Sequence, residues 1–226
     1  TSPRSRKGFR EDMCGESGRA VAREWGESIV VALFLALLIR SYLFQPFRIP
    51  SGSMRMTLIE GDRLFVNKLV YGPSLIPVEL RSFSSADAVP QGGSGWAKFL
   101  RTRVPGFSKP QRGDVIVFRY PVTRDKDFIK RLIAFGGETV EIRDGQVLIN
   151  DQPVTQGAIA KIAYLNRGDY GEAGKKIRVP EGYYFVMGDN TASSHDSRYW
   201  GFVPGHFVIG KADVIFWPPN RIKWIR

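Results

Sequence analysis

The stretch VEIRDGQVLIN, residues 140–150, places two short apolar runs on either side of Asp144-Gly145. Runs that are rich in Val, Ile and Leu and bounded by turn residues are typical of β-strands. Asp-Gly suits a tight turn between two strands because these residues tolerate positive φ angles. The stretch therefore predicts an antiparallel β-hairpin.

Similar runs, rich in Val, Ile, Phe and Tyr and bounded by Gly, Pro or Asp, follow along the chain beyond Pro46: RLFVNKLVY (63–71), GDVIVFRYP (113–121), YYFVMGDN (183–190) and FVIGKADVIFW (207–217). They predict a mainly β domain over residues 45–226, built of antiparallel sheet. The stretch 72–111 is rich in Gly and Pro and is predicted to be a loop insertion in this domain.

Residues 28–39, SIVVALFLALLI, carry no charge, and the apolar run continues past Arg40 to Phe44. A helix over residues 29–44 is ~24 Å long at ~1.5 Å per residue, which is close to the thickness of a hydrocarbon core. We therefore predict one transmembrane helix over residues 28–44. A buried helix or a cleaved leader remains an alternative. Bulky residues stand where a leader would have its small-residue cleavage site, which favours a retained signal anchor.

Basic residues gather before this run: Arg4, Arg6, Lys7, Arg10, Arg19 and Arg23. The positive-inside rule then predicts that residues 1–27 form a cytoplasmic tail. The chain would be a single-pass protein of the inner (plasma) membrane, with its β domain on the outer, periplasmic side. The net charge of +11 suits nucleic acid or anionic lipid. The apolar run favours lipid, so we expect membrane phospholipid as a partner and no nucleic acid.

Metal chemistry is disfavoured by the scarcity of soft ligands. The chain has one cysteine, Cys14, and two histidines, His195 and His206, and it has no H-E-x-x-H run. One cysteine cannot form an intramolecular disulfide, and these residues are too few for the usual zinc hydrolase site. We expect neither a metal nor a cofactor.

Two common serine hydrolase motifs are also missing. No G-x-S-x-G run occurs, which excludes the nucleophile elbow of the α/β-hydrolases. The residues three positions after Ser51 and Ser53 are Met54 and Met56 rather than lysine, which argues against a penicillin-recognising enzyme.

Three segments nevertheless stand out in order. FRIPSGSM (47–54) follows the apolar run, FIKRLI (128–133) comes next, and GDN (188–190) leads to DSRYWG (196–201). Together they are similar to the boxes of bacterial type I signal peptidases, and the resemblance covers most of residues 45–217. It implies a membrane-bound serine endopeptidase that uses a lysine as general base and removes signal peptides from exported preproteins.

The resemblance implies a role for each matching residue. Ser53 would be the nucleophile and Lys130 the general base. The Ser51 hydroxyl and the Ser53 backbone N–H would bind the oxyanion, and Ser194 would hydrogen-bond the lysine amine. A supporting pair and a set of pocket-lining residues are also implied, namely Asp196 with Arg198, and Phe47, Ile49, Pro50 and Ile129.

The local sequence suits such a base. A lysine amine accepts a proton only when it is neutral, and burial among apolar neighbours lowers its pKa. Phe128, Ile129, Leu132 and Ile133 surround Lys130 in sequence. If this segment is a strand, Arg131 points to the opposite face because side chains alternate.

Two departures from the family pattern stand near the boxes. Arg55-Met56-Thr57 follows the first box, where most relatives carry a proline shortly after Ser-Met. Thr191 and Ala192 follow Asn190, where the third box usually continues with Arg-Asp. The exit of the serine loop and a salt bridge of the third box are therefore in question, but neither change touches the dyad.

Plainer interpretations of the same residues stay open. Taken alone, Lys130 is typical of a solvated surface lysine. The run P-S-G-S is typical of an ordinary turn, and Asp196 with Arg198 could be a surface ion pair. His195 beside Asp196 suggests a Ser-His-Asp triad, although adjacent residues rarely present their side chains in that order. Two rival functions remain. One is a self-cleaving serine-lysine transcriptional repressor, and the other is a membrane-anchored β domain without enzymatic activity.

Overall fold

The structure, a computed structural model, describes residues 23–37, 39, 43–72 and 106–225. The chain divides into two compact units, residues 1–41 and 42–226. Most of the predicted cytoplasmic tail and of the predicted loop insertion lies outside the described residues, so both stay predictions.

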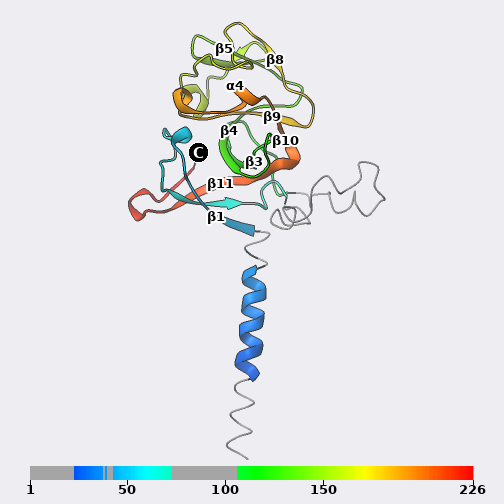
Figure 1. Ribbon diagram of the computed structural model, residues 1–226, viewed down its shortest axis with the longest axis vertical. Helices are drawn as coiled ribbons and strands as arrows, with labels where there is room; N and C mark the ends of the chain where they lie inside the picture. The colour runs from blue at the N-terminus through cyan, green and yellow to red at the C-terminus, as the bar shows by residue number, and fades with distance from the viewer. Residues whose placement is uncertain (1–22, 38, 40–42, 73–105, 226) are drawn as a thin grey trace, which may run out of the picture. The chain divides into compact units, whose positions relative to one another are not determined.

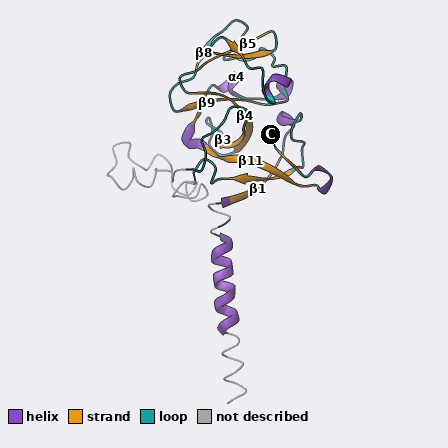
Figure 2. Cartoon of the chain, turned by 180° about the vertical axis from the view of Figure 1, so that it is seen from behind, coloured by secondary structure: helices purple, strands orange, loops and turns teal. Residues whose placement is uncertain are grey.

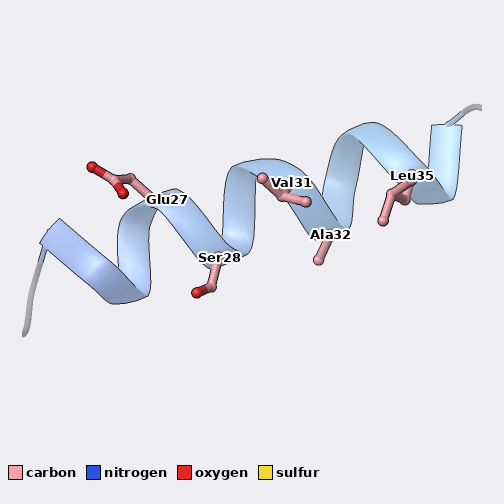
Figure 3. A pocket seen from close by; sticks show the side chains of 5 residues that line it. All are labelled: Glu27, Ser28, Val31, Ala32 and Leu35. Atoms are coloured by element: carbon pink, nitrogen blue, oxygen red, sulfur yellow. The ribbon is translucent and has the colours of Figure 1, made fainter.

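The described part of the first unit is a helix over residues 23–37. Its large apolar side chains from Ile29 to Leu37 are exposed on all sides of the helix, by 51% to 66%. Figure 3 shows a pocket lined by side chains of this helix alone: Glu27, Ser28, Val31, Ala32 and Leu35. Residues three or four apart share one side of a helix, so this pocket is a groove between neighbouring side chains.

Within the described residues, no helix combines the length and the hydropathy that a membrane span requires. Residues 38 and 40–42 of the predicted span 28–44 are not among them.

The second unit is built of antiparallel sheet (Figures 1 and 2), as predicted. Among the described residues, an eight-stranded sheet has the order β1-β2-β11-β3-β4-β9-β10, with β12 beside β11, and a four-stranded sheet has the order β7-β6-β5-β8. The strands are β1 (Phe44–Arg48), β2 (Arg63–Asn67), β3 (Val115–Arg119), β4 (Asp127–Phe135), β5 (Thr139–Arg143), β6 (Gln146–Ile149), β7 (Gln152–Pro153), β8 (Ile177–Arg178), β9 (Tyr183–Met187), β10 (Val203–Pro204), β11 (Val208–Trp217) and β12 (Lys223–Trp224).

The predicted hairpin is confirmed as β5 and β6. Asp144 and Gly145 form its turn with φ angles of 51° and 78°, and Arg143 pairs with Gln146 at its base. The positive φ angles are the reason that Asp-Gly is favoured here. Within the second unit, β5 and β8 lie at the end opposite to β1 and β11 (Figures 1 and 2).

In the described part of the second unit, the helical segments are short turns between strands. They are η2 (Gly52–Met54), η4 (Ile159–Lys161), η5 (Thr191–Ser193), α4 (Ser197–Trp200), η6 (Gly205–Phe207) and η7 (Pro219–Arg221). The carboxylate of Asp196 caps α4 by accepting a hydrogen bond from the backbone N–H of Arg198. Aspartate is a favoured residue at this position because it satisfies an N–H that has no partner in the helix.

The central strand β4 contributes to three apolar clusters. Ile129 belongs to a cluster with residues of β1, β2, β11 and η2, whereas Ile133 packs with the small sheet and Leu132 with β3 and β9. Burial along β4 is continuous from Ile129 to Ala134. Any charged residue in this part of β4 must therefore lie inside the protein.

Candidate active site

Ser53 lies in η2, in the turn that connects β1 to β2. The backbone of Ile49 closes the base of this connection, because its N–H donates to Asp62 O and its carbonyl accepts from Gly61 N, each at 2.9 Å. Met54 and Leu58 are fully buried and hold the turn on the core. Ser53 is 8% exposed. Ser51 is exposed and precedes the turn in an extended conformation.

Lys130 lies on β4 and is buried, so a solvated surface lysine is the wrong interpretation. Its amine donates a hydrogen bond of 2.6 Å to the Ser53 hydroxyl oxygen. Burial lowers the pKa of Lys130 to about 8, while the nearby carboxylates of Asp196 and Asp189 act in the opposite direction. A substantial fraction of this amine is thus neutral in weakly alkaline solution and can accept a proton.

The neighbouring Arg131 is fully buried and forms an ion pair that sequence reasoning missed. Its guanidinium donates to both carboxylate oxygens of Asp189, at 2.8 and 2.6 Å, and to the Thr57 hydroxyl at 3.0 Å. Thr57 donates in turn to Asp189 at 2.5 Å. This network joins β4, the turn after Ser53 and the segment after β9. Its one signal in the sequence is that Asp189 belongs to the GDN segment.

The ion pair of Asp196 and Arg198 is likewise buried rather than on the surface, with both side chains 0% exposed. Asp196 also accepts from the backbone N–H of Gly188 at 2.9 Å, and Arg198 donates to the carbonyl of Leu165 at 2.8 Å. The hydroxyl of Thr191, in the stretch that departs from the family pattern, accepts from Arg198 at 3.3 Å. The pair therefore connects the end of β9 with Leu165 and Thr191 through hydrogen bonds.

Ser194 is buried, but its hydroxyl has no hydrogen-bond partner among the described residues. The hydrogen bond expected between Ser194 and the Lys130 amine is therefore not formed. The hydroxyl instead lies against Gly188, where any side chain would collide with it.

His195 is not arranged as the histidine of a triad. Its ring stacks on Tyr199 and lies 3.4 Å from the Tyr120 hydroxyl, while the carboxylate of Asp196 is occupied by Arg198.

The residues predicted to line the substrate pocket come together only in part. Ile49 and Ile129 are buried in one apolar cluster, and Phe47 packs against it. Pro50 is exposed beyond them. Met54, which the sequence did not single out for this cluster, belongs to it as well.

In the part of the chain that the structure describes, no three side chains of His, Cys, Asp or Glu come together as a metal site would need. The catalytic turn and β4 place a serine hydroxyl beside a desolvated amine.

Comparisons with known proteins show which family this chain belongs to. The family model for signal peptidase, peptidase S26, matches residues 22–217. Signal peptidase I of Pseudomonas aeruginosa is 34% identical over 88% of this chain and 75% of that protein. Signal peptidase I of Aquifex aeolicus is 34% identical over 83% of each chain. Among solved structures, a signal peptidase I from Enterococcus faecalis is 37% identical over 46% of this chain and 97% of that chain, with a TM-score of 0.39. The chain belongs to the signal peptidase family, peptidase S26.

Proposed function

We propose that this signal peptidase cleaves signal peptides from exported preproteins with Ser53 as nucleophile and Lys130 as general base. Membership of the family supplies the reaction class, which is that of a serine endopeptidase. The observation that carries the residue assignment is the 2.6 Å contact between the Lys130 amine and the Ser53 hydroxyl in a buried setting. Serine–lysine pairs are an established variant of the serine protease triad.

The chemistry follows from this contact. Neutral Lys130 takes the proton of Ser53 as the hydroxyl oxygen attacks the carbonyl carbon of the scissile bond. The hydroxyl of Ser51 and the backbone N–H of Ser53 stabilise the resulting oxyanion. Lys130 then gives its proton to the leaving amine, which leaves an ester on Ser53. Water, deprotonated by Lys130, attacks this ester and releases the signal peptide.

We assign Ser194, Asp196 and Arg198 to the support of Lys130. The amine becomes an ammonium with three donors while it holds the proton, and it then needs acceptors. The Ser194 hydroxyl is buried and unused, so it can serve as one of them. The ion pair of Asp196 and Arg198 keeps that serine in place.

The peptide is proposed to bind as an added strand. In the described part of the chain, β1 pairs with β2 alone and forms one edge of the large sheet. An extended peptide can hydrogen-bond to such an edge while alternate side chains enter pockets. Phe47, Ile49 and Ile129 lie beside the catalytic turn. With Pro50, they would form shallow apolar pockets for small residues.

Residues 28–44 are proposed to anchor the protein in the inner membrane, with the N-terminus in the cytoplasm and the protease domain on the periplasmic side. Support comes from the apolar side chains that surround the helix over residues 23–37 and are exposed on every side. A helix that is apolar all round normally lies in a protein core or in a membrane. Protease protection of residues 1–27 in inverted and right-side-out vesicles tests this topology.

The outer face of β1, β2 and β11 supports phospholipid as a partner. Antiparallel sheets usually place polar residues on a solvated face, but here the rings of Phe44, Phe65 and Phe216 contact one another. Trp224, 70% exposed, lies on the neighbouring β12. Tryptophan is enriched at membrane interfaces, and phenylalanine is typical of the apolar face of segments that lie in the interface. We call Phe44, Phe65, Phe216 and Trp224 the aromatic face.

Two arginines adjoin the aromatic face. Arg48 and Arg63 lie directly opposite each other on β1 and β2, and alternation places them on the same side as Phe44 and Phe65. Like charges in this position are destabilising. An anionic headgroup between them would relieve the repulsion.

Cleavage of a synthetic leader peptide of the Ala-x-Ala type by the purified full chain tests the proposed function. Ser53→Ala and Lys130→Ala should each abolish cleavage, and the double variant should be no worse than either single one, because the two groups act as a unit. Ser108→Ala and Lys161→Ala, at exposed positions, serve as matched controls. Substantial cleavage by Lys130→Ala would overturn the assignment of the dyad.

A further inference from the structure

Asn190 makes two contacts to consecutive carbonyl groups of the catalytic turn. Its backbone N–H donates to the Ser53 carbonyl at 2.9 Å, and its side-chain amide donates to the Gly52 carbonyl at 2.9 Å. The turn and Asn190 are 138 positions apart in the chain. The segment after β9 thus forms hydrogen bonds with the backbone of the nucleophile and of the residue before it.

The Gly52 carbonyl has a particular significance for catalysis. It belongs to the same peptide unit as the Ser53 N–H, and this unit is planar, with the two groups pointing in opposite directions. Fixing the carbonyl oxygen therefore fixes the direction of the N–H. A hydrogen bond to the carbonyl also polarises the peptide unit and strengthens its N–H as a donor.

The Ser53 N–H is free to donate to an oxyanion because of its position in the turn. Ser53 is in the first turn of η2, where N–H groups have no intrahelical acceptor. The Gly52 carbonyl accepts a second, longer bond from the Arg55 N–H at 3.2 Å, which closes the turn. Asn190 supplies the donor from outside the turn that fixes the orientation of this peptide unit.

The two residues before Asn190 also pack closely against the catalytic turn. A Cβ atom at Gly188 would lie 2.6 Å from the Ser53 carbonyl oxygen, so only glycine allows this approach. The backbone N–H of Asp189 contacts the sulfur of Met54 at 3.4 Å. Residues 188–190 therefore lie along the turn as one continuous support.

We propose that Asn190 is a positioning residue for the oxyanion site, which aims and polarises the Ser53 N–H through the Gly52 carbonyl. This inference rests on the proposed function, because it takes Ser53 as the nucleophile. Asn190 forms no hydrogen bond with Ser53 Oγ or Lys130 Nζ, so its contribution lies in the transition state and not in activating the nucleophile.

The variants Asn190→Ala and Asn190→Asp remove the amide donor. We expect kcat to fall about 10-fold in Asn190→Ala, which corresponds to the loss of one modest hydrogen bond, while KM stays unchanged. Asn190→Asp should lose more, because its carboxylate adds negative charge beside the developing oxyanion. The pH midpoint of kcat/KM should stay where it is, since the surroundings of Lys130 are intact.

A peptide boronic acid gives a second readout, because it forms an anionic tetrahedral adduct on the serine oxygen. Its affinity should fall by the same factor as kcat/KM, whereas the affinity of an uncleavable substrate peptide should not change. Merely loosening the turn would weaken both ligands and shift the pH midpoint.

Asn166→Asp is the matched control. The Asn166 side-chain amide also donates to two backbone carbonyls, those of Ile142 at 2.9 Å and Gly171 at 3.1 Å, and neither carbonyl belongs to the catalytic turn. This variant should lower the melting temperature without changing kcat or boronate affinity. If Asn190→Asp does not fold, Asn190→Ala makes the same test.

Wild-type kcat and boronate affinity in a folded Asn190→Ala variant would overturn the inference and leave the proposed dyad untouched. Equal losses for the boronate and for the uncleavable peptide would overturn it as well. Failure of the proposed function has a different signature, which is cleavage by Ser53→Ala.

Discussion

The amine of Lys130 lies 2.6 Å from the hydroxyl oxygen of Ser53, although 77 positions separate the two residues in the chain. Ile129 of β4 and Met54 of the turn that follows β1 belong to one apolar cluster, and Lys130 and Ser53 are both buried. A lysine in water would be fully charged at neutral pH. The fold thus supplies the desolvation that makes this amine a base.

The rate of peptide cleavage should therefore rise as the pH rises. Burial lowers the pKa of Lys130 to about 8, and only the neutral amine accepts the Ser53 proton. We expect kcat/KM to rise with pH, with its midpoint at about pH 8, and to level off at higher pH. Initial rates on a leader peptide between pH 6 and pH 11 measure this profile. A midpoint that stayed near 10.4, the value of a free lysine, would contradict the desolvated base.

The same pKa shift predicts that the catalytic lysine costs stability. Its folded pKa lies below its unfolded pKa, so the unfolded chain binds more protons between about pH 8 and pH 10.4, and stability rises with pH across this window. Below pH 8 the cost is fully present, and it amounts to about 3 kcal/mol. Lys130→Met should thus raise the free energy of unfolding at pH 7 by up to this amount.

Urea unfolding of the full chain in detergent, at pH 7 and at pH 10.5, measures this effect. The gain of Lys130→Met over the wild type should be large at pH 7 and small at pH 10.5. Equal gains at both pH values would mean that methionine improves packing and that the charge of Lys130 costs nothing. Lys126→Met, at an exposed position, should show no gain at either pH.

The buried pair of Arg131 and Asp189 should be essential to stability. Among the described residues, Arg131→Met leaves the buried Asp189 carboxylate with only the Thr57 hydroxyl as a side-chain partner. Breaking a buried pair costs about 3–5 kcal/mol. The double change Arg131→Met with Asp189→Leu should recover part of this loss. Lys176→Met, which breaks an exposed pair with Asp151, should leave the urea midpoint unchanged. A small effect of Arg131→Met would show that water reaches Asp189.

How far the sequence predicts this molecule depends on how local each feature is. Asp144-Gly145 determines its hairpin turn through the φ angles of two adjacent residues, so the hairpin could be predicted. The run 63–71 predicts a single strand, but β2 ends at Asn67. The Asn67 side chain accepts a hydrogen bond from the backbone N–H of Leu69, and the chain turns there. Such competition between side chain and backbone is invisible in a hydrophobic pattern.

The candidate site depends on contacts between distant segments, and there the sequence alone reaches less far. Ser53 and Lys130 were singled out by resemblance, since nothing local separates Lys130 from a surface lysine. Arg131 and Asp189 were missed because a charged residue is assumed to be exposed unless its partner is known. That partner lies 58 positions away and meets Arg131 only when β4 pairs with β9.

Anionic lipid should raise the activity through Arg48 and Arg63. Each basic residue near a negatively charged membrane surface contributes about 1 kcal/mol to binding, roughly fivefold in affinity. The double variant Arg48→Gln with Arg63→Gln should lose most of the stimulation by phosphatidylglycerol vesicles. Its basal activity in neutral detergent should stay unchanged. Lys126→Gln with Lys161→Gln removes two exposed charges elsewhere and should keep the stimulation. Full stimulation of the arginine variant would refute the lipid contact.

Substrate choice should follow from the apolar cluster beside the catalytic turn. Ile49 and Ile129 are 1% and 6% exposed, so only a small part of each side chain can contact a substrate side chain. If the peptide adds to the edge at β1, every second side chain points toward this cluster. We therefore expect alanine or a similarly small residue at the positions one and three before the cut, with larger residues tolerated at the position between them.

Peptides with a single phenylalanine at one of these three positions make the test. Phenylalanine one or three positions before the cut should abolish cleavage, whereas phenylalanine between them should be tolerated. Ile49→Ala or Ile129→Ala removes apolar volume from the cluster and should admit valine or leucine at a position that accepts only alanine in the wild type. Ile133→Ala removes the same volume from β4 but faces the second apolar cluster, so it should cost stability and leave specificity alone. Because both kinds of variant lose a buried isoleucine, a change of specificity confined to Ile49 and Ile129 would separate a pocket wall from general loosening of the core. Unchanged specificity in all three variants would place the substrate pockets elsewhere.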